Sequence, residues 1–594
     1  MDIQGCTVMV LGGGGMVGRA VCRELLKNQP ARIVVCSLLE EESRQAIHSL
    51  QSELERVHRL THQSTPVELV AEWGNLFVRD SLRHQTGAQA MQTAEGRAAI
   101  IEDTLTPMSL TVARRFFLYQ LVLKYRPDVI IDAMNTATGI AYSDIFSQAR
   151  RVWRELERNE SGPQVESVER LLCSLYIPQL IRHVDVLYRA MVAVDTKAYL
   201  KLGTSGTGGM GWNIPYTHGE ERPSSVLLSK SAVAGAHTLL LFLLARTPGV
   251  ASLENEEEVV SKAPPATMEI KPTAMIGWRG IGHGPIYKRG KPVELEDLCL
   301  DSALPVGPGV SLQLEDPTCS RSSGRLLETV FVDTGENGLF STEEFVAITS
   351  PGQMEFVTPE EIARNVVDEI RGVNTGKDVI NALNVTCMGP TYRAGFQRQR
   401  AIQKLRELEQ QHGVDSIAFE NLGPPRLSKL LYEAYYLKKL FCDMQQIPQC
   451  SVEDIVARLL ELLRQQPDLV ATPVSIGIPI LYRKDEQLVL VRGRHVKTPP
   501  HAGDAEVTLD SHNLEEWARA GWIDLRAENV RLWQQRIQEM INDSLSIPAE
   551  DTSSRYVRDR EFWRGIDSDT WVIQPGEIAA WIFINEDKGE RGRE

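Results

Sequence analysis

The chain has 594 residues, more than a single hydrophobic core organises, so we expect several domains. Apolar residues make up 42% and charged residues 24%, as in soluble globular proteins. The formal net charge of −15 argues against general binding to nucleic acids or anionic membranes. The nine cysteines include no C-x-x-C pair, which indicates reduced thiols, a cytoplasmic location and no structural metal site.

The segment 7–18, TVMVLGGGGMVG, is the most informative part of the sequence. An apolar run ends in four glycines, and a helical pattern, RAVCRELLK, follows at once. This order predicts a strand, a tight turn and a helix N-terminus whose free N–H groups bind the pyrophosphate of a dinucleotide. A glycine-rich turn without a ligand is the alternative. The residues expected to line the site are Gly12, Gly15, Met16, Val17 and Gly18.

Further apolar runs predict the strands of a parallel sheet that alternate with helices. The runs lie at 32–36, 66–71, 128–133, 198–202 and from 268. Helical patterns lie at 42–60, 141–158, 165–193 and 229–245, with a helical insertion at 81–125. This alternation predicts an α/β, doubly wound Rossmann-type sheet in a domain that spans 1–290.

Polar residues at the strand ends are the expected cofactor contacts, because ligands bind at the carboxyl edge of such sheets. Ser37 stands where an acidic residue usually holds the ribose of NAD, and Glu40–Glu42 lie a few positions after it. The sequence therefore does not decide between NAD and NADP. Arg44 either meets a 2′-phosphate or lies on a solvated helix face. Asn75 either contacts the adenine or stabilises a turn, and Asn135 is expected in the cofactor cleft.

The segment 226–245 is apolar on nearly every face except at Lys230 and His237. These two residues are costly in lipid, so we expect a buried helix rather than a membrane span. One face of the helix can pack on the sheet, and the other requires a second copy of the chain or another domain. We therefore predict a homodimer, and we expect His237 to be a core histidine with its hydrogen bonds satisfied.

Two more regions follow the Rossmann domain. The segment 291–392 is predicted as a smaller substrate-side α/β region, with strands at 329–332, 344–348 and 378–384 and a helix at 358–371. The segment 393–594 is predicted as mostly helical, with a β-hairpin near 471–496. Its helices are expected at 395–411, 426–443, 451–466, 513–519 and 524–545, and the aromatic segment 571–583 is expected to pack on the body.

Taken together, these segments resemble the short-chain dehydrogenase/reductase superfamily. The motifs that carry the resemblance are GGGGMVG, WGNLFVRD, DVIIDAMN, GTSGTGG and SKSAVAGAHTLLLFL, and they cover roughly residues 5–290. The N-terminal layout is most similar to the extended branch that includes nucleotide-sugar dehydratases and epimerases. The resemblance implies bound NAD or NADP and hydride transfer at a carbon that bears a hydroxyl or carbonyl group. By analogy the substrate is then a small molecule such as a nucleotide sugar. The large insertions and the additional C-terminal residues suggest either a bulky substrate or a partner protein.

In that superfamily a Ser or Thr after the fifth strand orients the substrate carbonyl, and a Tyr exchanges the proton. A Lys four residues after the Tyr holds the nicotinamide ribose and lowers the Tyr pKa. By this resemblance Ser205 (or Thr204) and Lys230 take the first and third roles. However, Val226 stands four residues before Lys230 and carries no proton, and the nearest tyrosine is Tyr216.

Three explanations remain for the missing tyrosine. In the first, an insertion brings Tyr216 back to the site. In the second, His218 takes the role of the tyrosine, or the chemistry requires no phenol. In the third, the dehydrogenase chemistry is lost. The first two give the leading hypothesis, an NAD(P)-dependent oxidoreductase or an epimerase or dehydratase that uses bound cofactor. The third gives the alternative, a non-catalytic dinucleotide-binding scaffold or regulator whose C-terminal region binds a partner protein.

Three loop residues after the sixth predicted strand complete the expectations. By the resemblance Thr273 touches the nicotinamide carboxamide. Arg279 and His283 either face the substrate or are ordinary polar loop residues.

Overall fold

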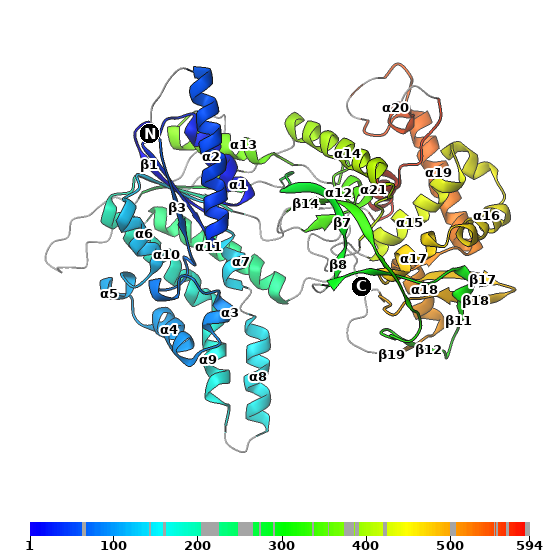
Figure 1. Cartoon of the computed structure of the whole chain (residues 1–594), viewed down its shortest axis with the longest axis horizontal. Helices are drawn as coiled ribbons and strands as arrows, with labels where there is room; N and C mark the ends of the chain where they lie inside the picture. The colour runs from blue at the N-terminus through cyan, green and yellow to red at the C-terminus, as the bar shows by residue number, and fades with distance from the viewer. Residues whose placement is uncertain are drawn as a thin grey trace. The chain divides into compact units, whose positions relative to one another are not determined.

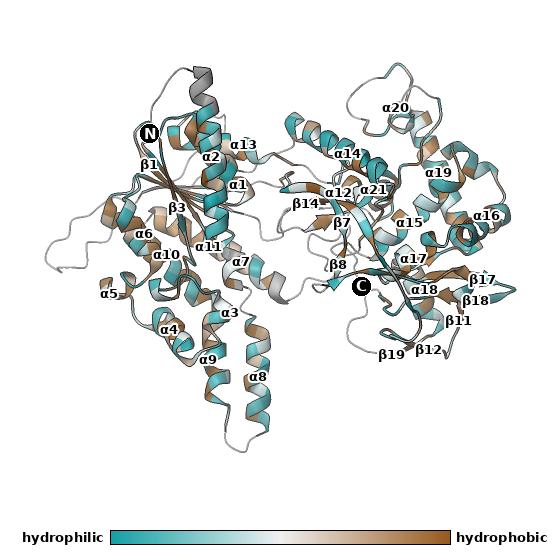
Figure 2. Cartoon of the chain, viewed as in Figure 1, coloured by the Kyte–Doolittle hydropathy of each residue, from teal (hydrophilic) through white to brown (hydrophobic). Residues whose placement is uncertain are grey.

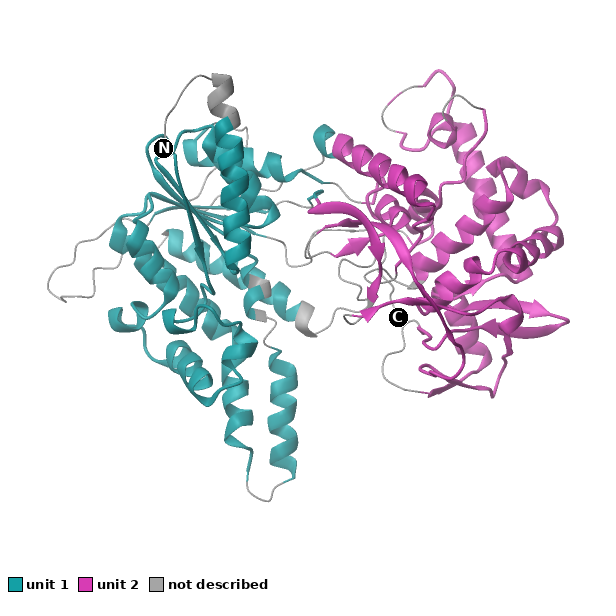
Figure 3. Ribbon diagram, in the orientation of Figure 1, with its two compact units in different colours: residues 1–209, 223–277, 356–394 teal, residues 210–222, 278–355, 395–594 magenta. Residues whose placement is uncertain are grey.

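The computed structural model divides the chain into two compact units, which Figure 3 shows in different colours. Unit 1 comprises residues 1–209, 223–277 and 356–394, and unit 2 comprises residues 210–222, 278–355 and 395–594. The structure describes the chain except for residues 62–66, 142–143, 159–161, 204–224, 247–264, 272–274, 289–290, 335–337, 354–355, 374–384, 387–390, 420–424, 499–505, 552, 554–555, 566–568 and 588–594.

Unit 1 is built on a seven-stranded, entirely parallel sheet in the order β16-β6-β5-β4-β1-β2-β3 (Figure 1). The strand order reverses between β1 and β4, so the predicted doubly wound Rossmann-type fold is confirmed. The strands are β1 (Thr7–Leu11), β2 (Arg32–Ser37), β3 (Glu68–Trp73), β4 (Val129–Asp132), β5 (Ala198–Leu202), β6 (Ala266–Ile270) and β16 (Val385–Thr386).

Helices cover both faces of this sheet because successive strand residues point to opposite sides and both sides are apolar. Val8 and Val10 of β1 join the core under α1 (Met16–Leu26), α2 (Glu40–Thr61) and α13 (Pro359–Arg371). Met9 and Leu11 join the core under α6 (Phe117–Tyr125), α10 (Tyr176–Val194) and α11 (Ser225–Arg246). Hydrophobic residues are accordingly concentrated in the sheet of unit 1 in Figure 2.

The predicted helical insertion forms five short elements between β3 and β4. They are a 3-10 turn (Asp80–Leu82), α3 (Gly87–Ala90), α4 (Ala94–Leu105), α5 (Leu110–Ala113) and α6. Between β4 and β5 lie α7 (Thr136–Ala141), α8 (Ile145–Glu157), α9 (Val165–Cys173) and α10. The side chains of Thr86, Thr93 and Ser109 cap α3, α4 and α5, which explains why these short helices begin where they do.

Unit 2 combines small antiparallel sheets with helices. One sheet has the order β15 (Leu339–Phe340), β14 (Glu328–Asp333) and β7 (Gly280–Pro285), and another has β11 (Leu304–Pro305), β18 (Gln487–Val491), β17 (Ile480–Lys484) and β20 (Ile523–Asp524). Two-stranded sheets pair β10 (Glu294–Glu296) with β13 (Ser322–Leu326), β12 (Ser311–Gln313) with β19 (Glu506–Thr508) and β8 (Tyr287–Lys288) with β9 (Lys291–Pro292).

The predicted hairpin exists as β17 and β18, and Asp485 and Glu486 form its two-residue turn with positive φ angles of 48° and 69°. One expected strand is a helix, and the hairpin begins later than expected. Residues 344–348 lie in a helix, α12 (Thr342–Ile348), because Ser341 and Glu344 form a capping box. The hairpin was expected to begin near 471, but residues 468–475 form α17 (Asp468–Ser475), and its first strand begins at Ile480. The strand expected at 378–384 lies outside the described residues.

The predicted helices of the C-terminal half are present. They are α14 (Tyr392–His412), α15 (Pro425–Leu440), α16 (Val452–Gln465), α18 (Ser511–Ala520) and α19 (Ala527–Ser546), followed by α20 (Arg560–Trp563) and α21 (Pro575–Asn585). Trp571 and Trp581 are buried, which confirms that the C-terminal segment packs on its unit.

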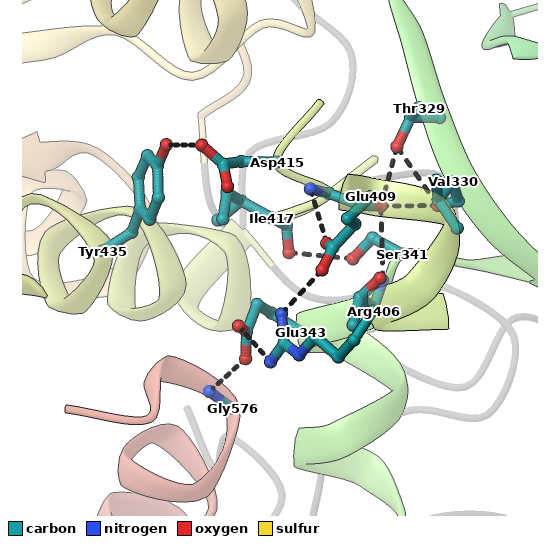
Figure 4. A network of polar contacts seen from close by, with 12 residues as sticks. Thr329, Val330, Ser341, Glu343, Arg406, Glu409, Asp415, Ile417, Tyr435 and Gly576 are labelled. Atoms are coloured by element: carbon teal, nitrogen blue, oxygen red, sulfur yellow. Dashed lines mark hydrogen bonds and ion pairs between the residues drawn. The ribbon is translucent and has the colours of Figure 1, made fainter. Parts of the chain in front are cut away.

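Buried charges tie the helices of unit 2 together (Figure 4). Arg406 of α14 lies 2.7 Å from Glu343 of α12 and 2.9 Å from Glu409. Glu343 also accepts a hydrogen bond from the backbone N–H of Gly576, and Glu409 accepts one from Ser416. Because each carboxylate is satisfied, the network is structural. The sequence alone did not separate these acids from solvated helix faces.

The units are not consecutive stretches of sequence. Helix α13 packs against α1, and Val357 bridges Met275 near the end of β6, so residues 356–394 belong to unit 1. The boundaries of these units therefore differ from those of the domains expected from the sequence, which were 1–290, 291–392 and 393–594.

Candidate functional site

The glycine-rich loop connects β1 to α1 in a conformation that requires glycine at two positions. Gly12 has a φ of +77°, and a Cβ atom there would lie 3.0 Å from the backbone of Ala133 and Met134. A Cβ atom on Gly18 would overlap the carbonyl oxygen of Gly12. The first turn of α1 therefore packs directly on the loop, as the spacing of the glycines predicts.

The N-terminus of α1 is available to an anion. Its N-cap is Gly15, which provides no side-chain hydrogen bond, so the first N–H groups of the helix have no capping side chain. Met16 and Val17 begin the helix and are half-buried. This arrangement of a strand, an open glycine cradle and an uncapped helix fits the pyrophosphate of NAD or NADP.

Two side chains support the glycine loop from beside it. The Oγ atom of Ser37 accepts a hydrogen bond from the N–H of Gly14 at 2.9 Å, and Ser37 is buried. The Nε atom of Arg19 donates to the carbonyl oxygen of Gly14 at 2.8 Å. From the sequence, Ser37 is expected near the ribose, whereas the structure shows that it supports the loop. No role was predicted for Arg19, although it directly follows Gly18 in the sequence.

Arg44 and Asn75 are both engaged within the chain. Arg44 pairs with Glu40 and lies over the ring of Trp73, 5.3 Å from its centroid. Asn75 follows β3, and its side-chain oxygen accepts a hydrogen bond from the backbone N–H of Phe77 at 3.1 Å. Asn75 therefore stabilises the turn after β3, and its contact with the adenine stays a prediction.

A row of charged side chains crosses three neighbouring strands near their carboxyl ends. The parallel register aligns Asp132 of β4 with Lys201 of β5, and Lys201 with Glu269 of β6. We call these three residues the strand-end row, and all three are buried. The Lys201 ammonium lies 2.9 Å from Asp132, whose other carboxylate oxygen accepts from the Tyr199 hydroxyl at 2.9 Å.

The strand-end row also shapes the loop after β4. Lys201 donates to the carbonyl oxygen of Met134 at 2.8 Å and to the hydroxyl of Thr136 at 3.1 Å. Asn135 lies between these two residues and is half-buried. Burial alone would raise the pKa of Asp132, but the Lys201 ammonium outweighs it and the pKa lies below its ordinary value. Burial raises the pKa of Glu269.

Two histidines lie near the strand-end row. His183 of α10 and His237 of α11 have ring centroids 6.4 Å apart, and both are buried. Burial lowers the pKa of His183 to about 4 and that of His237 to about 3, so both are neutral at pH 7. The Nε2 atom of each has no hydrogen-bond partner among the described residues. His237 is thus a core histidine as expected, but one of its ring nitrogens is not satisfied.

Lys230 lies on the same helix as His237, two turns earlier, and only 4% of it is exposed. A buried lysine in an apolar helix requires polar partners or a function. Its expected companions Thr204, Ser205, Tyr216 and His218 lie outside the described residues, as do Thr273 and the side chain of Val226. Their roles stay predictions.

Arg279 and His283 belong to unit 2. Arg279 is exposed, and its backbone N–H donates to Asp333 at 2.7 Å. His283 of β7 stacks on His412 with ring centroids 3.9 Å apart, and its Nε2 atom lies 3.5 Å from Glu328. The described residues of the chain contain no group of three or more His, Cys, Asp or Glu side chains that could hold a metal ion.

The parallel sheet, its switch point and the glycine cradle define a Rossmann-type domain. Family models match two parts of the chain. Residues 8–94 match the model described as polysaccharide biosynthesis protein, and residues 297–587 match the model described as beta-methylindole-3-pyruvate reductase C-terminal domain. The first match includes the glycine cradle, and the second, to a domain of a reductase, supports an oxidoreductase role.

Solved structures similar to the chain include a short-chain dehydrogenase/reductase from Serratia marcescens. It is 12% identical over 66% of this chain and 99% of that one, with a TM-score of 0.28. A short-chain type dehydrogenase/reductase from Mycobacterium ulcerans is 10% identical over 68% of this chain and 100% of that one, with a TM-score of 0.28. A search among curated proteins found no match.

The first prediction concerns the glycine cradle. In Gly18→Ala the new methyl group overlaps the backbone of Gly12, and overpacking of this kind costs about 1–3 kcal/mol. Titration calorimetry should show that the Kd for NAD(P)H rises about tenfold or more. The control is Gly235→Ala on α11, where a Cβ atom meets nothing within 4 Å. Equal binding by both variants would contradict the assignment of the cradle.

The second prediction concerns the buried histidines. Their pKa values in the folded state, about 4 and about 3, lie below the ordinary 6.5, so the unfolded chain takes up protons first as the pH falls. The contribution of these neutral histidines to the free energy of unfolding is complete above pH 6.5. It decreases between pH 6.5 and 4, by about 1.4 kcal/mol per pH unit for each histidine.

Urea unfolding at pH 7 and pH 5 measures this effect. The double variant His183→Leu/His237→Leu should lose less stability between these pH values than the wild type. The control is His512→Leu, because His512 lies on the surface of α18. An unchanged pH dependence in the double variant would show that the two histidines are not neutral in the folded protein.

Proposed function

We propose that the protein is an NAD(P)-dependent oxidoreductase that transfers a hydride between C4 of the nicotinamide and a substrate carbon that bears oxygen. The glycine cradle at the N-terminus of α1 is the observation that carries this proposal. Gly12 and Gly18 allow the loop to pack closely on its surroundings, and the N-terminus of α1 has no capping side chain, as in a site for a dinucleotide pyrophosphate. When bound, the cofactor supplies or accepts the hydride. Gly12, Gly15, Met16, Val17 and Gly18 would hold its pyrophosphate.

The proposed substrate is a 2-oxo acid that is reduced to a 2-hydroxy acid. The support is the match of residues 297–587 to the C-terminal domain model of a beta-methylindole-3-pyruvate reductase, a name that refers to the reduction of an indolepyruvate. The resemblance of the N-terminal part to nucleotide-sugar dehydratases and epimerases supports the second candidate, a reaction that oxidises and re-reduces a bound sugar nucleotide.

The proposed roles in proton transfer follow the family pattern. Ser205 orients the substrate oxygen, Tyr216 exchanges its proton, and Lys230 holds the nicotinamide ribose and stabilises the tyrosinate. The burial of Lys230 supports its part, since its charge then acts in a medium of low dielectric constant. The strand-end row fixes the loop that carries Asn135, which lies beside the proposed cleft.

The third prediction tests this function. Calorimetric titration with NAD(H) and NADP(H) should show tight binding of one cofactor, weakened about tenfold or more in Lys230→Ala because the ribose loses a charged partner. Oxidation of the bound coenzyme, followed at 340 nm, should occur with indole-3-pyruvate. Tyr216→Phe should lower kcat by a factor of about 100 or more while cofactor binding is kept.

Each result has a distinct meaning. Cofactor binding without turnover, and without an effect of Tyr216→Phe, would favour the scaffold hypothesis that Val226 suggests. Absence of binding of either cofactor would overturn both hypotheses. The substrate class is tested separately by a comparison of indole-3-pyruvate with a nucleoside diphosphate sugar.

We also propose a homodimer in the cytoplasm, formed through α10 and α11. Among the described residues α11 is the one helix long and apolar enough to cross a membrane, and 39% of its window Leu228–Ala245 is buried. Lys230 and His237 inside this window make a soluble interface the better explanation. Exposed apolar residues of the two helices support it, namely Leu228, Leu239, Leu243, Ile177 and Ile181. The described cysteines are free thiols, which agrees with a reducing compartment.

The fourth prediction follows from this surface. Light scattering at micromolar concentration should give the mass of a dimer, and Leu239→Glu/Leu243→Glu should give a folded monomer because the new charges cannot be desolvated. The control is Leu156→Glu, which adds a charge at an exposed leucine of α8. A monomeric wild type would contradict the proposal.

A further inference from the structure

A cavity of about 270 Å³ lies inside unit 1, between the turn that follows β3 and the inserted helices. Its walls are mostly apolar and include Phe77, Phe116, Met91 and Ile100. Arg182 of α10 is also part of the wall. An apolar cavity of about 150 Å³ already holds a benzene ring, so this one has room for an aromatic ring with a short polar arm.

Within the part of the chain that the structure describes, Arg182 forms no ion pair. Its guanidinium donates hydrogen bonds to the carbonyl oxygens of Thr104 and Thr106, which are neutral. Its Nε atom is buried and has no hydrogen-bond partner among the described residues. Burial lowers the pKa of Arg182. An anion that entered the cavity would provide the missing charge.

The acids nearest to Arg182 are already committed to other arginines. Asp185 pairs with Arg189 at 2.7 Å. Asp103, which also lines the cavity, binds Arg79 through two hydrogen bonds of 2.7 Å. The cavity lining carries one positive and one negative residue, Arg182 and Asp103, and Asp103 is already paired with Arg79. Arg182 is therefore the charge of the lining that is available to a ligand, and it favours a carboxylate over a neutral or cationic group.

The aromatic wall is held in a fixed position. The ring of Phe77 lies against Gly139, where a Cβ atom would approach it to 2.9 Å, and against His183 at a centroid distance of 4.7 Å. His183 in turn contacts His237 on the helix that carries Lys230. A rigid ring face favours a flat aromatic ligand.

We propose that this cavity binds an aromatic carboxylate, with its ring between Phe77 and Phe116 and its carboxylate on Arg182. As a substrate site the inference rests on the proposed function, because an aryl-substituted 2-oxo acid has this chemistry. The same chemistry also describes a product or an unreactive effector, and the kinetic part of the experiment distinguishes these sources.

The fifth prediction measures binding of indole-3-acetate, which has the ring and the carboxylate but no ketone to reduce. Calorimetry on the full-length protein, with and without NADPH, should show binding that weakens about tenfold or more in Arg182→Met. 3-Methylindole, which lacks the carboxylate, should bind the wild type as weakly as indole-3-acetate binds Arg182→Met. Arg151→Met, an arginine of α8 that does not line the cavity, is the matched control.

A second variant keeps the test decisive if Arg182→Met does not fold. Ile100→Trp fills the cavity from α4 and should abolish binding of indole-3-acetate. Competitive inhibition of indole-3-pyruvate reduction by indole-3-acetate would identify the cavity as the substrate site, and non-competitive inhibition would identify an effector site. Both support the proposal. Binding that neither variant changes, or no binding by the wild type, would overturn it.

The experiments distinguish a failure of the cavity assignment from a failure of the proposed function. If the protein binds indole-3-acetate through Arg182 but reduces no ketone, the cavity assignment stands and the reductase proposal fails. If it reduces indole-3-pyruvate and Arg182→Met changes neither KM nor binding, the reductase proposal stands and the cavity assignment fails.

Discussion

The buried ion pair of Lys201 and Asp132 is the interaction on which the carboxyl edge of the sheet depends. Both charges lie in the protein interior, and each would be costly there without the other. The same ammonium also holds the loop after β4 through Met134 and Thr136. The glycine cradle lies against this loop, because Gly12 approaches the backbone of Ala133. One electrostatic contact thus fixes the surface on which a dinucleotide would lie.

The surroundings of this pair are unusually rich in groups that are polar but uncharged at neutral pH. Tyr199 donates to Asp132, while His183 and His237 remain neutral because burial disfavours their cationic forms. Neutral imidazoles next to a buried ammonium avoid repulsion and keep polarisable groups near the edge of the sheet. This combination explains how an interior with so many titratable groups remains compatible with a folded core.

Much of unit 1 was predictable from the sequence because its signals are local. The glycine spacing, the apolar runs and the helix caps each act within a few residues, so β1, α1, β5 and α13 lie where the pattern indicated. The strand-end row was missed because Asp132 and Lys201 are far apart in the sequence, and only the parallel register makes them neighbours. Two charged residues inside otherwise apolar strands were the available signal.

Unit 2 was less predictable for a related reason. Its acids, such as Glu343 and Glu409, have the spacing of solvated helix faces, yet they are buried because Arg406 and backbone N–H groups satisfy them. Partners of this kind come from distant segments, so composition does not indicate them. Of the candidate site, the cradle could be placed from the sequence and its support by Arg19 and Ser37 could not.

Residues 356–394 belong to unit 1 although residues 278–355, which precede them, belong to unit 2. This order affects how the chain folds during synthesis. Helix α13 covers apolar residues of α1 and of the sheet, and β16 completes the sheet beside β6. During synthesis the ribosome must therefore deliver the strands of unit 2 between residues 278 and 355 before the Rossmann core can close. Until then the apolar residues that α13 covers are exposed, and exposed apolar surface of this kind favours aggregation of a partly folded chain.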